Sequence, residues 1–469
     1  MPPFQIRGVI EGFYGRPWTP RDRREVVTFM KQRGFNEYVY APKDDPYHRK
    51  RWREPYPKVE MITFDDVLSY LRHGAVRFVF GLSPGLDIVY SDPQDEAAIW
   101  RKWDVLWERG VRRFLLALDD VDPVLRPADA AAYGEGPAAL GRAQGELVAR
   151  LWEAGRARDP EFRLYFCPTE YHGTEPTPYR AALAATVPAE VPIIWTGPRV
   201  VSPEIRADDA RAIARVLGRP PLIWDNYPVN DFRPERLFLG PIRGREAALA
   251  ESCLGVWINP MVQATASELA LHTWDLFLTA PEAYDPQAAW EDAARAIGGR
   301  HAWEALLRFA ELNQSSRLWD AEAPRLKAAL DAFWAAFEAG EAARLDAACV
   351  DLDRMWEEIA SLPEELEAHL PRRDLYGELR PWLERLAAEV DLARRALEAL
   401  RRHAAHGGAA AGAAREDAAV GAGAAGAGVA GGAGVSAELR AALEALPAGR
   451  VVAEGMIAGF VRRAAEVLV

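Results

Sequence analysis

Asp119 and Asp120 are the two residues whose types and spacing most directly suggest chemistry. They follow the apolar run 114–118, which predicts a short buried strand, so both carboxylates are expected at its C-terminal end. Two carboxylates held close together cannot both ionise freely, so one pKa is raised and a proton stays available near neutral pH. One protonated acid beside one ionised acid is what glycoside hydrolysis requires. Taken alone, an Asp-Asp pair at a strand end is more often a solvated turn or a helix N-cap.

Eight short apolar runs precede such polar clusters in the first part of the chain. They lie at residues 6–10, 37–40, 77–82, 114–118, 164–167, 192–195, 222–224 and 255–258. Amphipathic, helix-like stretches separate them, and eight βα units in about 260 residues predict an α/β fold of the (β/α)8 barrel type. A doubly wound open sheet is the alternative, although it usually has fewer strands and a single Gly-rich turn. Polar, aromatic, Gly and Pro residues follow every run, which predicts a functional rim at one end of the barrel.

The composition divides the 469 residues into four parts. We expect the catalytic barrel over residues 1–285 and a helical bundle over 286–406, where Ala, Leu, Glu and Arg recur at helical spacing. Residues 407–435 are rich in Gly and Ala and bury too little side-chain surface to offset their ordering cost, which predicts a linker or long loop. Helices are expected again over 436–469, after the good N-cap residue Ser436.

Charge and cysteine content exclude several classes of protein. A net charge of −12 argues against nucleic acid or an anionic membrane surface as the main partner. Cys167, Cys253 and Cys349 are odd in number and widely spaced, which predicts neither a disulfide framework nor a zinc site. No segment reaches the ~20 apolar residues of a membrane span. We therefore expect a cytoplasmic protein with no membrane association and no metal site.

Several motifs of the barrel region resemble glycoside hydrolase family 84, which contains the O-GlcNAcases and related bacterial β-N-acetylglucosaminidases. The strongest are RGVIEGFYGRPW at residues 7–18 and YAPKDD at 40–45. Further matches lie at 83–87, 167–171, 195–198, 224–226 and 239–241. The resemblance runs in colinear order over about residues 5–262 and is weak or absent in the C-terminal part, where only the helical character agrees.

The resemblance implies a retaining exo-β-N-acetylglucosaminidase that works by substrate-assisted catalysis. In that mechanism the 2-acetamido oxygen of the sugar attacks the anomeric carbon and forms an oxazoline, an exception to the usual two-carboxylate scheme. Asp119 matches the acid that holds and polarises the acetamido N–H, a role that needs the ionised form. Asp120 matches the general acid that protonates the leaving oxygen and then activates water, a role that begins with the protonated form. No metal or organic cofactor is implied.

Seven further residues match the family's sugar-binding positions: Gly12, Lys43, Tyr171, Trp224, Asn226, Asp231 and Asn259. On the acetamido side, the resemblance implies that Tyr171 bonds to the acetamido oxygen or oxazoline. Trp224 would line the pocket for the acetamido methyl group, and Asn226 would contact the acetamido group and support the aspartate pair. A core Tyr or a core Trp would look the same in sequence.

On the hydroxyl side, Gly12 lies where the family's backbone meets the sugar, an approach that only a residue without a Cβ permits. Lys43 is expected to hydrogen-bond a sugar hydroxyl, although a surface salt bridge is the ordinary alternative. Asp231 and Asn259 match the pair that binds the 4- and 6-hydroxyls at the closed end of the pocket.

The substrate and partners stay open at this point. An O-GlcNAc-modified protein or peptide is the first candidate, and free or cell-wall-derived amino-sugar oligosaccharides are the second, because the matched residues recognise the sugar and not its aglycone. A non-catalytic sugar-binding protein is the third. The helical part either packs against the barrel or, by the resemblance, pairs with a second copy to form a homodimer.

Overall fold

The computed structural model describes residues 3–72, 74–416 and 427–469, and the chain forms two compact units. The first unit takes in the described residues of Met1–Phe232, Pro241–Ala293 and Arg317–Trp319. The second consists of Arg233–Gly240, Ala294–Ser316 and the described residues of Asp320–Val469. Within the described ranges, no helix combines the length and the apolar character that crossing a membrane requires.

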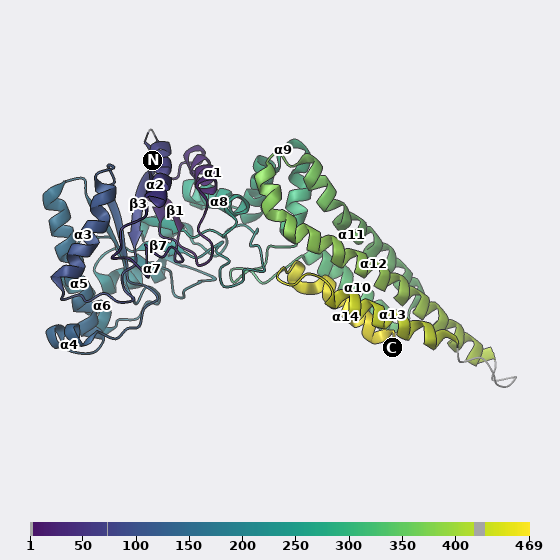
Figure 1. The fold of residues 1–469 in the computed structure, drawn as a ribbon. Coiled ribbons are helices and arrows are strands. Elements are labelled where there is room, and N and C mark those ends of the chain that lie inside the picture. The colour runs from purple at the N-terminus through teal and green to yellow at the C-terminus, as the bar shows by residue number, and fades with distance from the viewer. Residues whose placement is uncertain (1–2, 73, 417–426) are drawn as a thin grey trace. The chain divides into compact units, whose positions relative to one another are not determined.

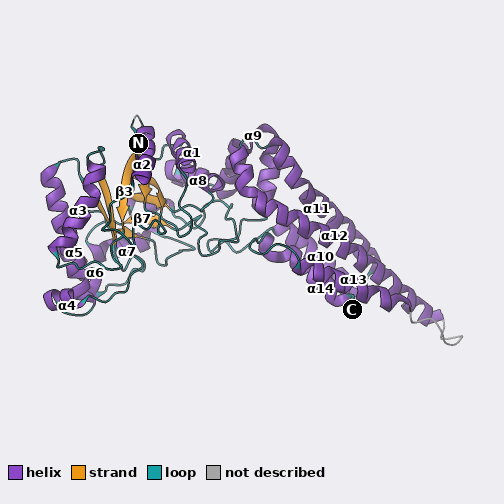
Figure 2. Cartoon of the chain, in the orientation of Figure 1, coloured by secondary structure: helices purple, strands orange, loops and turns teal. Residues whose placement is uncertain are grey.

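The first unit is built around eight parallel strands (Figures 1 and 2). The strands are β1 (Ile6–Glu11), β2 (Glu37–Tyr40), β3 (Arg77–Leu82), β4 (Arg113–Ala117), β5 (Arg163–Cys167), β6 (Ile194–Trp195), β7 (Leu222–Asp225) and β8 (Gly255–Ile258). They pair in the order β5-β4-β3-β2-β1-β8-β7-β6, and a parallel bridge between Phe166 and Ile193 joins the two ends. The prediction of a (β/α)8 barrel is confirmed, and the open sheet is excluded.

Small differences in strand bounds have a physical reason. The run 192–195 forms only the two-residue strand β6. Pro192 has no N–H to donate to a neighbouring strand, although its carbonyl accepts a hydrogen bond from the Phe166 N–H at 3.0 Å. Strand β4 covers Arg113–Ala117, one residue earlier than the predicted run 114–118. Asp119 therefore lies two residues beyond the end of the strand.

The helices of this unit alternate with the strands. They are α1 (Pro20–Gln32), α2 (Lys58–Leu71), α3 (Pro93–Trp107), α4 (Pro127–Tyr133), α5 (Pro137–Arg158), α6 (Pro178–Thr186), α7 (Ala207–Leu217) and α8 (Ala264–Thr279), with short 3-10 turns η1 (Ala247–Glu251) and η2 (Pro281–Ala283). Proline opens five of these α-helices, where its fixed φ and missing N–H cost nothing. In α1 the Thr19 side chain accepts from the Asp22 N–H, and the Asp22 carboxylate accepts from the Thr19 N–H.

The interior of the barrel is filled by inward-facing side chains from all eight strands, including Val39, Leu115, Leu222 and Trp257. Parallel strands covered by helices are buried on both faces, which explains why they appear in the sequence as short apolar runs and not as alternating patterns. The packed interior leaves the loops after the strands as the place for a site.

The second unit is helical. Its helices are the C-terminal part of α9 (Pro286–Glu311), α10 (Pro324–Ala339), α11 (Ala342–His369), α12 (Arg373–Glu416), α13 (Ala427–Glu444) and α14 (Met456–Val467), with the 3-10 turn η4 (Ala453–Gly455) before α14. The predicted linker over 407–435 needs correction, because α12 continues to Glu416 and α13 already begins at Ala427. Alanine is the strongest helix former, so an Ala-rich stretch can continue a helix despite its glycines. Residues 417–426 of the predicted linker lie outside the described residues.

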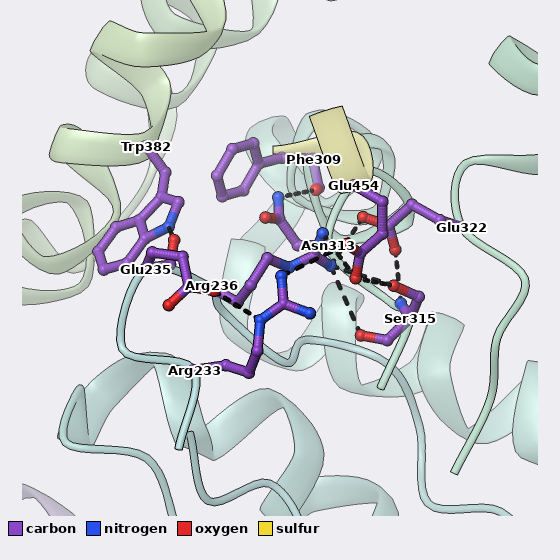
Figure 3. Close-up of polar contacts among 9 residues, drawn as sticks. All are labelled: Arg233, Glu235, Arg236, Phe309, Asn313, Ser315, Glu322, Trp382 and Glu454. Atoms are coloured by element: carbon purple, nitrogen blue, oxygen red, sulfur yellow. Dashed lines mark hydrogen bonds and ion pairs between the residues drawn. The ribbon is translucent and has the colours of Figure 1, made fainter. Parts of the chain in front are cut away.

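A buried charge network holds several segments of the second unit together (Figure 3). The fully buried Arg236 forms ion pairs with Glu322 at 2.8 Å and with Glu454 at 3.2 Å. Ser315 donates its backbone N–H to Glu322 and its hydroxyl to Glu454, at 2.5 and 2.9 Å. A buried charge is tolerated only when it is paired and hydrogen-bonded, so each acid depends on the other members.

We expect Glu322→Gln to lower the free energy of unfolding by about 3 kcal/mol, because it removes one of the two counter-charges of a fully buried guanidinium. Urea titration followed by circular dichroism measures this. The matched control is Glu384→Gln, in an exposed i,i+4 pair with Arg380, which should cost less than about 0.5 kcal/mol. Equal effects of the two variants would show that the buried network contributes little.

Candidate active site

All the residues predicted for the site line one cavity of about 520 Å³ in the barrel unit. Its walls include Gly12, Lys43, Asp119, Asp120, Tyr171, Trp224, Asn226, Asp231 and Asn259. Gly12 follows β1, Lys43 follows β2, and the two aspartates follow β4. Residues from loops after different strands converge because the carboxyl ends of parallel strands meet at one face of the barrel.

Two larger cavities, of about 630 and 620 Å³, lie at the amino ends of the strands. Both contain Arg77, Arg113 and Arg163 in their walls. Neither contains adjacent carboxylates or any of the residues predicted for the site. We therefore place the candidate site at the carboxyl end, on the chemistry of the lining residues and not on cavity size.

Asp119 is a buried carboxylate with one paired and one unpaired oxygen. Lys43 donates to its Oδ2 at 2.5 Å, and both side chains are almost completely buried. Its Oδ1 is buried and has no hydrogen-bond partner, and neither has the indole Nε1–H of Trp224 on the same cavity wall. Unsatisfied buried polar atoms are costly and rare, so these two atoms indicate where a bound molecule would supply a donor and an acceptor.

Asp120 is held from three directions. Its Oδ1 accepts from the Tyr171 hydroxyl at 2.7 Å, and its Oδ2 accepts from the Tyr14 hydroxyl at 2.9 Å. Its carbonyl oxygen accepts from Arg49 at 2.8 Å. The φ angle of Asp120 is +50°, a left-handed conformation that costs energy for a residue with a side chain and persists only where the surroundings hold it.

The electrostatics of Asp120 differ from what the sequence predicted. Burial raises its pKa, but the charge of Lys43, the hydrogen bonds from Tyr171 and Tyr14 and the charge of Arg49 together bring the pKa below its ordinary value. In this arrangement the nearby cations and phenols favour the ionised form of Asp120, and its role as the protonated acid remains a prediction. The neighbouring charge that dominates is a cation, Lys43, rather than the second aspartate.

The other sugar-binding candidates form a connected set. Asn259 accepts from the Gly12 N–H at 3.3 Å and donates its amide to the Asn226 Oδ1 at 2.9 Å. Asp231 accepts from the Tyr14 N–H at 2.9 Å, and burial raises its pKa. This network orients the amides and carboxylate toward the cavity that they line.

Two of these residues have partners that the sequence did not predict. Lys43 was expected to reach a sugar hydroxyl, and here it is the counter-ion of Asp119, although an ammonium group has three donors and can serve more than one acceptor. The Asn226 amide donates to the Val200 carbonyl at 2.8 Å, in the loop after β6, and not to the aspartate pair. Its predicted support of the pair remains a prediction.

Several residues of the site were not among those predicted from the sequence. Tyr14 belongs to the polar cluster after β1 and could have been selected on that signal. Arg49 lies well beyond the end of β2, and nothing in its sequence position marks it. Arg317 lines the cavity and lies over the ring of Phe232, with 5.3 Å from guanidinium carbon to ring centroid, but it comes from a region interpreted only as helical packing.

The geometry agrees with the comparison with known families. Residues 7–311 match the family described as beta-N-acetylglucosaminidase. The chain is a member of this β-N-acetylglucosaminidase family. The resemblance to glycoside hydrolase family 84 is thereby confirmed.

Relatives of known structure and name support this membership of the glucosaminidase family. The Protein O-GlcNAcases of Rattus norvegicus and Mus musculus are each 37% identical to this chain over 272 residues, which is 57% of this chain and 29% of theirs. The chain thus matches less than a third of the length of these relatives. A mutant of the Thermobaculum terrenum O-GlcNAc hydrolase superposes with a TM-score of 0.87 at 28% identity, over 99% of this chain and 95% of that protein. For CpGH84B the TM-score is 0.81 at 26% identity, over 99% and 77%.

Gly12 provides a test of the pocket wall. A Cβ at this position would lie 2.3 Å from the Trp224 ring, so Gly12→Ala should push the indole out of place. Overpacking of this kind costs about 1–3 kcal/mol, and the same free energy lost from sugar binding corresponds to a decrease of roughly 5- to 150-fold in kcat/KM on an aryl N-acetylglucosaminide. Gly377→Ala is the control, because a Cβ there meets nothing within 4 Å. Unchanged kinetics for Gly12→Ala would mean that Trp224 does not shape the sugar site.

Proposed function

We propose that the chain is a retaining exo-β-N-acetylglucosaminidase that uses the substrate's own acetamido group as nucleophile and acts on O-GlcNAc attached to Ser or Thr of proteins. The observation that carries the proposal is the unpaired, buried Oδ1 of Asp119, directly beside Asp120 in the cavity. A 2-acetamido N–H is a donor of the right kind for this oxygen. The reaction needs that contact, because it draws the amide oxygen toward the anomeric carbon.

Asp119 acts in this proposal through its carboxylate. Its Oδ2 is 2.5 Å from the Lys43 ammonium, and its unpaired Oδ1 can accept the acetamido N–H and stabilise the positive charge that develops on the amide as the oxazoline forms. Burial strengthens this interaction, since solvent does not screen it.

Asp120 supplies the proton for the leaving oxygen and then withdraws a proton from the attacking water. Tyr171 would donate to the acetamido oxygen, and Trp224 would pack against the acetamido methyl group. Gly12, Lys43, Asp231 and Asn259 would bind the sugar hydroxyls, with Asp231 and Asn259 at the 4- and 6-positions. The fixed backbone of Asp120 and the shared hydrogen bonds of the set pre-organise these contacts.

O-GlcNAc on protein is the first choice of substrate because the relatives named above carry the names Protein O-GlcNAcase and O-GlcNAc hydrolase. An amino-sugar oligosaccharide is the alternative, since the cavity residues address the sugar. We propose a cytoplasmic location on the cysteine pattern, which predicts no disulfide framework. A homodimer formed through the helical unit is a further proposal, which size-exclusion chromatography with light scattering tests.

The deciding experiment compares release of N-acetylglucosamine from defined O-GlcNAc peptides with release from chitobiose, using Asp120→Asn as the matched inactive protein. Higher kcat/KM on the peptides supports the first substrate, and higher kcat/KM on chitobiose supports the second. Proton NMR of the first-formed anomer should show retention. Protein that binds N-acetylglucosamine but releases no 4-nitrophenol from its β-glycoside would instead be a sugar-binding protein, and the catalytic proposal would be wrong.

A further inference from the structure

The hydrogen bonds to Asp120 seen here favour its ionised form, whereas the proposed reaction begins with the protonated form. Both of its carboxylate oxygens accept phenolic protons, Oδ1 from Tyr171 and Oδ2 from Tyr14. An acid that protonates a glycosidic oxygen must carry its own proton and direct it at the substrate. Each phenolic hydrogen bond stabilises the carboxylate form, so the loss of one of them favours the protonated acid.

Arg49 determines which of the two phenols keeps its hydrogen bond to Asp120. It donates to the Tyr14 hydroxyl oxygen at 2.6 Å, and a phenol has a single proton. Since the Tyr14 hydroxyl oxygen accepts a hydrogen bond from Arg49, the Tyr14 proton is directed to Asp120 Oδ2. Arg49 also donates to the Asp120 carbonyl at 2.8 Å and is itself 6% exposed, so it holds both the backbone and one carboxylate oxygen.

Tyr171 has no such constraint on its hydroxyl. Its backbone is anchored, because its carbonyl accepts the Thr196 N–H at 2.8 Å, but the hydrogen bond recorded for its hydroxyl is the one to Asp120 Oδ1. In the proposed function this same hydroxyl serves the acetamido oxygen. One proton cannot serve both acceptors, so the two contacts exclude each other.

We propose, resting on the function proposed above, that sugar binding transfers the Tyr171 hydrogen bond from Asp120 to the acetamido oxygen and that Asp120 then takes up one proton from solvent. The proton binds Oδ1, the oxygen that Tyr171 leaves, and neutralises the carboxylate. It passes from there to the glycosidic oxygen when that bond breaks. Arg49 and Tyr14 are positioning residues that keep Oδ2 and the backbone of Asp120 in place throughout.

The charged and titratable groups facing Asp120 are compatible with this exchange. The cations Lys43 and Arg49 and the two phenols lower its pKa, whereas Asp119 has its own counter-ion in Lys43. Loss of one phenolic bond and displacement of solvent by the sugar both raise the pKa of a carboxyl group. Asp231 also interacts with Asp120 and is the competing site of proton uptake, and the buried Cys167 thiol, whose pKa is raised, stays protonated.

Calorimetric titration with N-acetylglucosamine at pH 6.5, in buffers of different ionisation enthalpy, measures the protons taken up on binding. We expect up to one proton per bound sugar, falling toward zero at lower pH, where Asp120 is already protonated. Asp231→Asn should retain the uptake and Asp120→Asn should abolish it. Tyr171→Phe should reduce it, because that variant has no hydrogen bond to release.

Binding without uptake in the wild-type protein, or uptake lost in Asp231→Asn and kept in Asp120→Asn, would overturn the inference. These outcomes differ from failure of the proposed function, which would appear as absence of both sugar binding and aryl glycoside hydrolysis.

The pH dependence of kcat tests the role of Arg49 separately. Arg49→Lys keeps the charge but loses the two-armed contact that directs the Tyr14 proton to Oδ2, and Tyr14→Phe removes the hydrogen bond to Oδ2 itself. Both should move the basic limb of the kcat–pH profile upward by about one pH unit, since the carboxylate form loses a hydrogen bond that stabilises it. Lower activity with an unmoved limb would assign Arg49 a structural role only.

Discussion

Asp120→Asn is expected to lower kcat/KM by roughly 1,000-fold on substrates with a poor leaving group, such as an O-GlcNAc peptide, within the range that general acid catalysis provides. The loss should be far smaller for aryl glycosides with acidic phenols, because these leave without protonation. Asn cannot donate a proton in place of the acid but preserves its shape. Its amide oxygen can accept from one of the two tyrosines, while its NH2 group faces the other.

The measurement is a series of substituted phenyl N-acetylglucosaminides compared with a peptide. In the variant, log kcat/KM should fall steeply with the pKa of the leaving phenol, whereas the wild-type dependence should be shallow. Asp122→Asn is the control, an exposed aspartate two residues further along the same loop. Equal losses across the series would contradict the assignment of Asp120 as the acid.

Asp119→Asn is expected to slow oxazoline formation by roughly 100- to 1,000-fold whatever the leaving group, the scale observed when one pre-organised electrostatic group is removed. The amide still occupies the space but carries no charge to stabilise the developing oxazolinium. It also leaves the Lys43 ammonium, with a side chain 2% exposed, without its counter-ion.

The same series of phenyl glycosides distinguishes this variant. Its plot of log kcat/KM against the pKa of the leaving phenol should lie below that of the wild type and run parallel to it. Circular dichroism and thermal melting of the purified variant check that the unpaired lysine has not unfolded the barrel. Rates near those of the wild type would refute the role of Asp119 in orienting the acetamido group.

Much of the barrel could be predicted because its strands are buried on both faces. Seven of the eight apolar runs correspond closely to strands, and the eighth shortens to β6 (Ile194–Trp195), where Pro192 weakens the pairing. The predicted site residues converge for the same reason, since parallel strands deliver the residues that follow them to one face. The sequence therefore predicts that Asp119, Tyr171 and Asn259 lie close together.

The helical part was harder to predict from composition. The Gly/Ala-rich segment after His406 combines the best and one of the poorest helix formers, and the helix propensities of Ala and Gly oppose each other there. The helix α12 continues to Glu416, whereas low complexity had predicted a linker from 407 onward.

The sequence by itself determined which chemical groups the site contains, because the adjacent aspartates and the polar clusters after the strands are local features of the chain. Only the tertiary structure decided how that chemistry is arranged. Three interactions of the site join residues that lie 35 to 76 positions apart in the sequence. They are the ion pair of Lys43 with Asp119 and the hydrogen bonds from Arg49 to the Tyr14 hydroxyl and to the Asp120 carbonyl. Protonation depends on the charges and donors within a few ångströms, and these distances are set by packing.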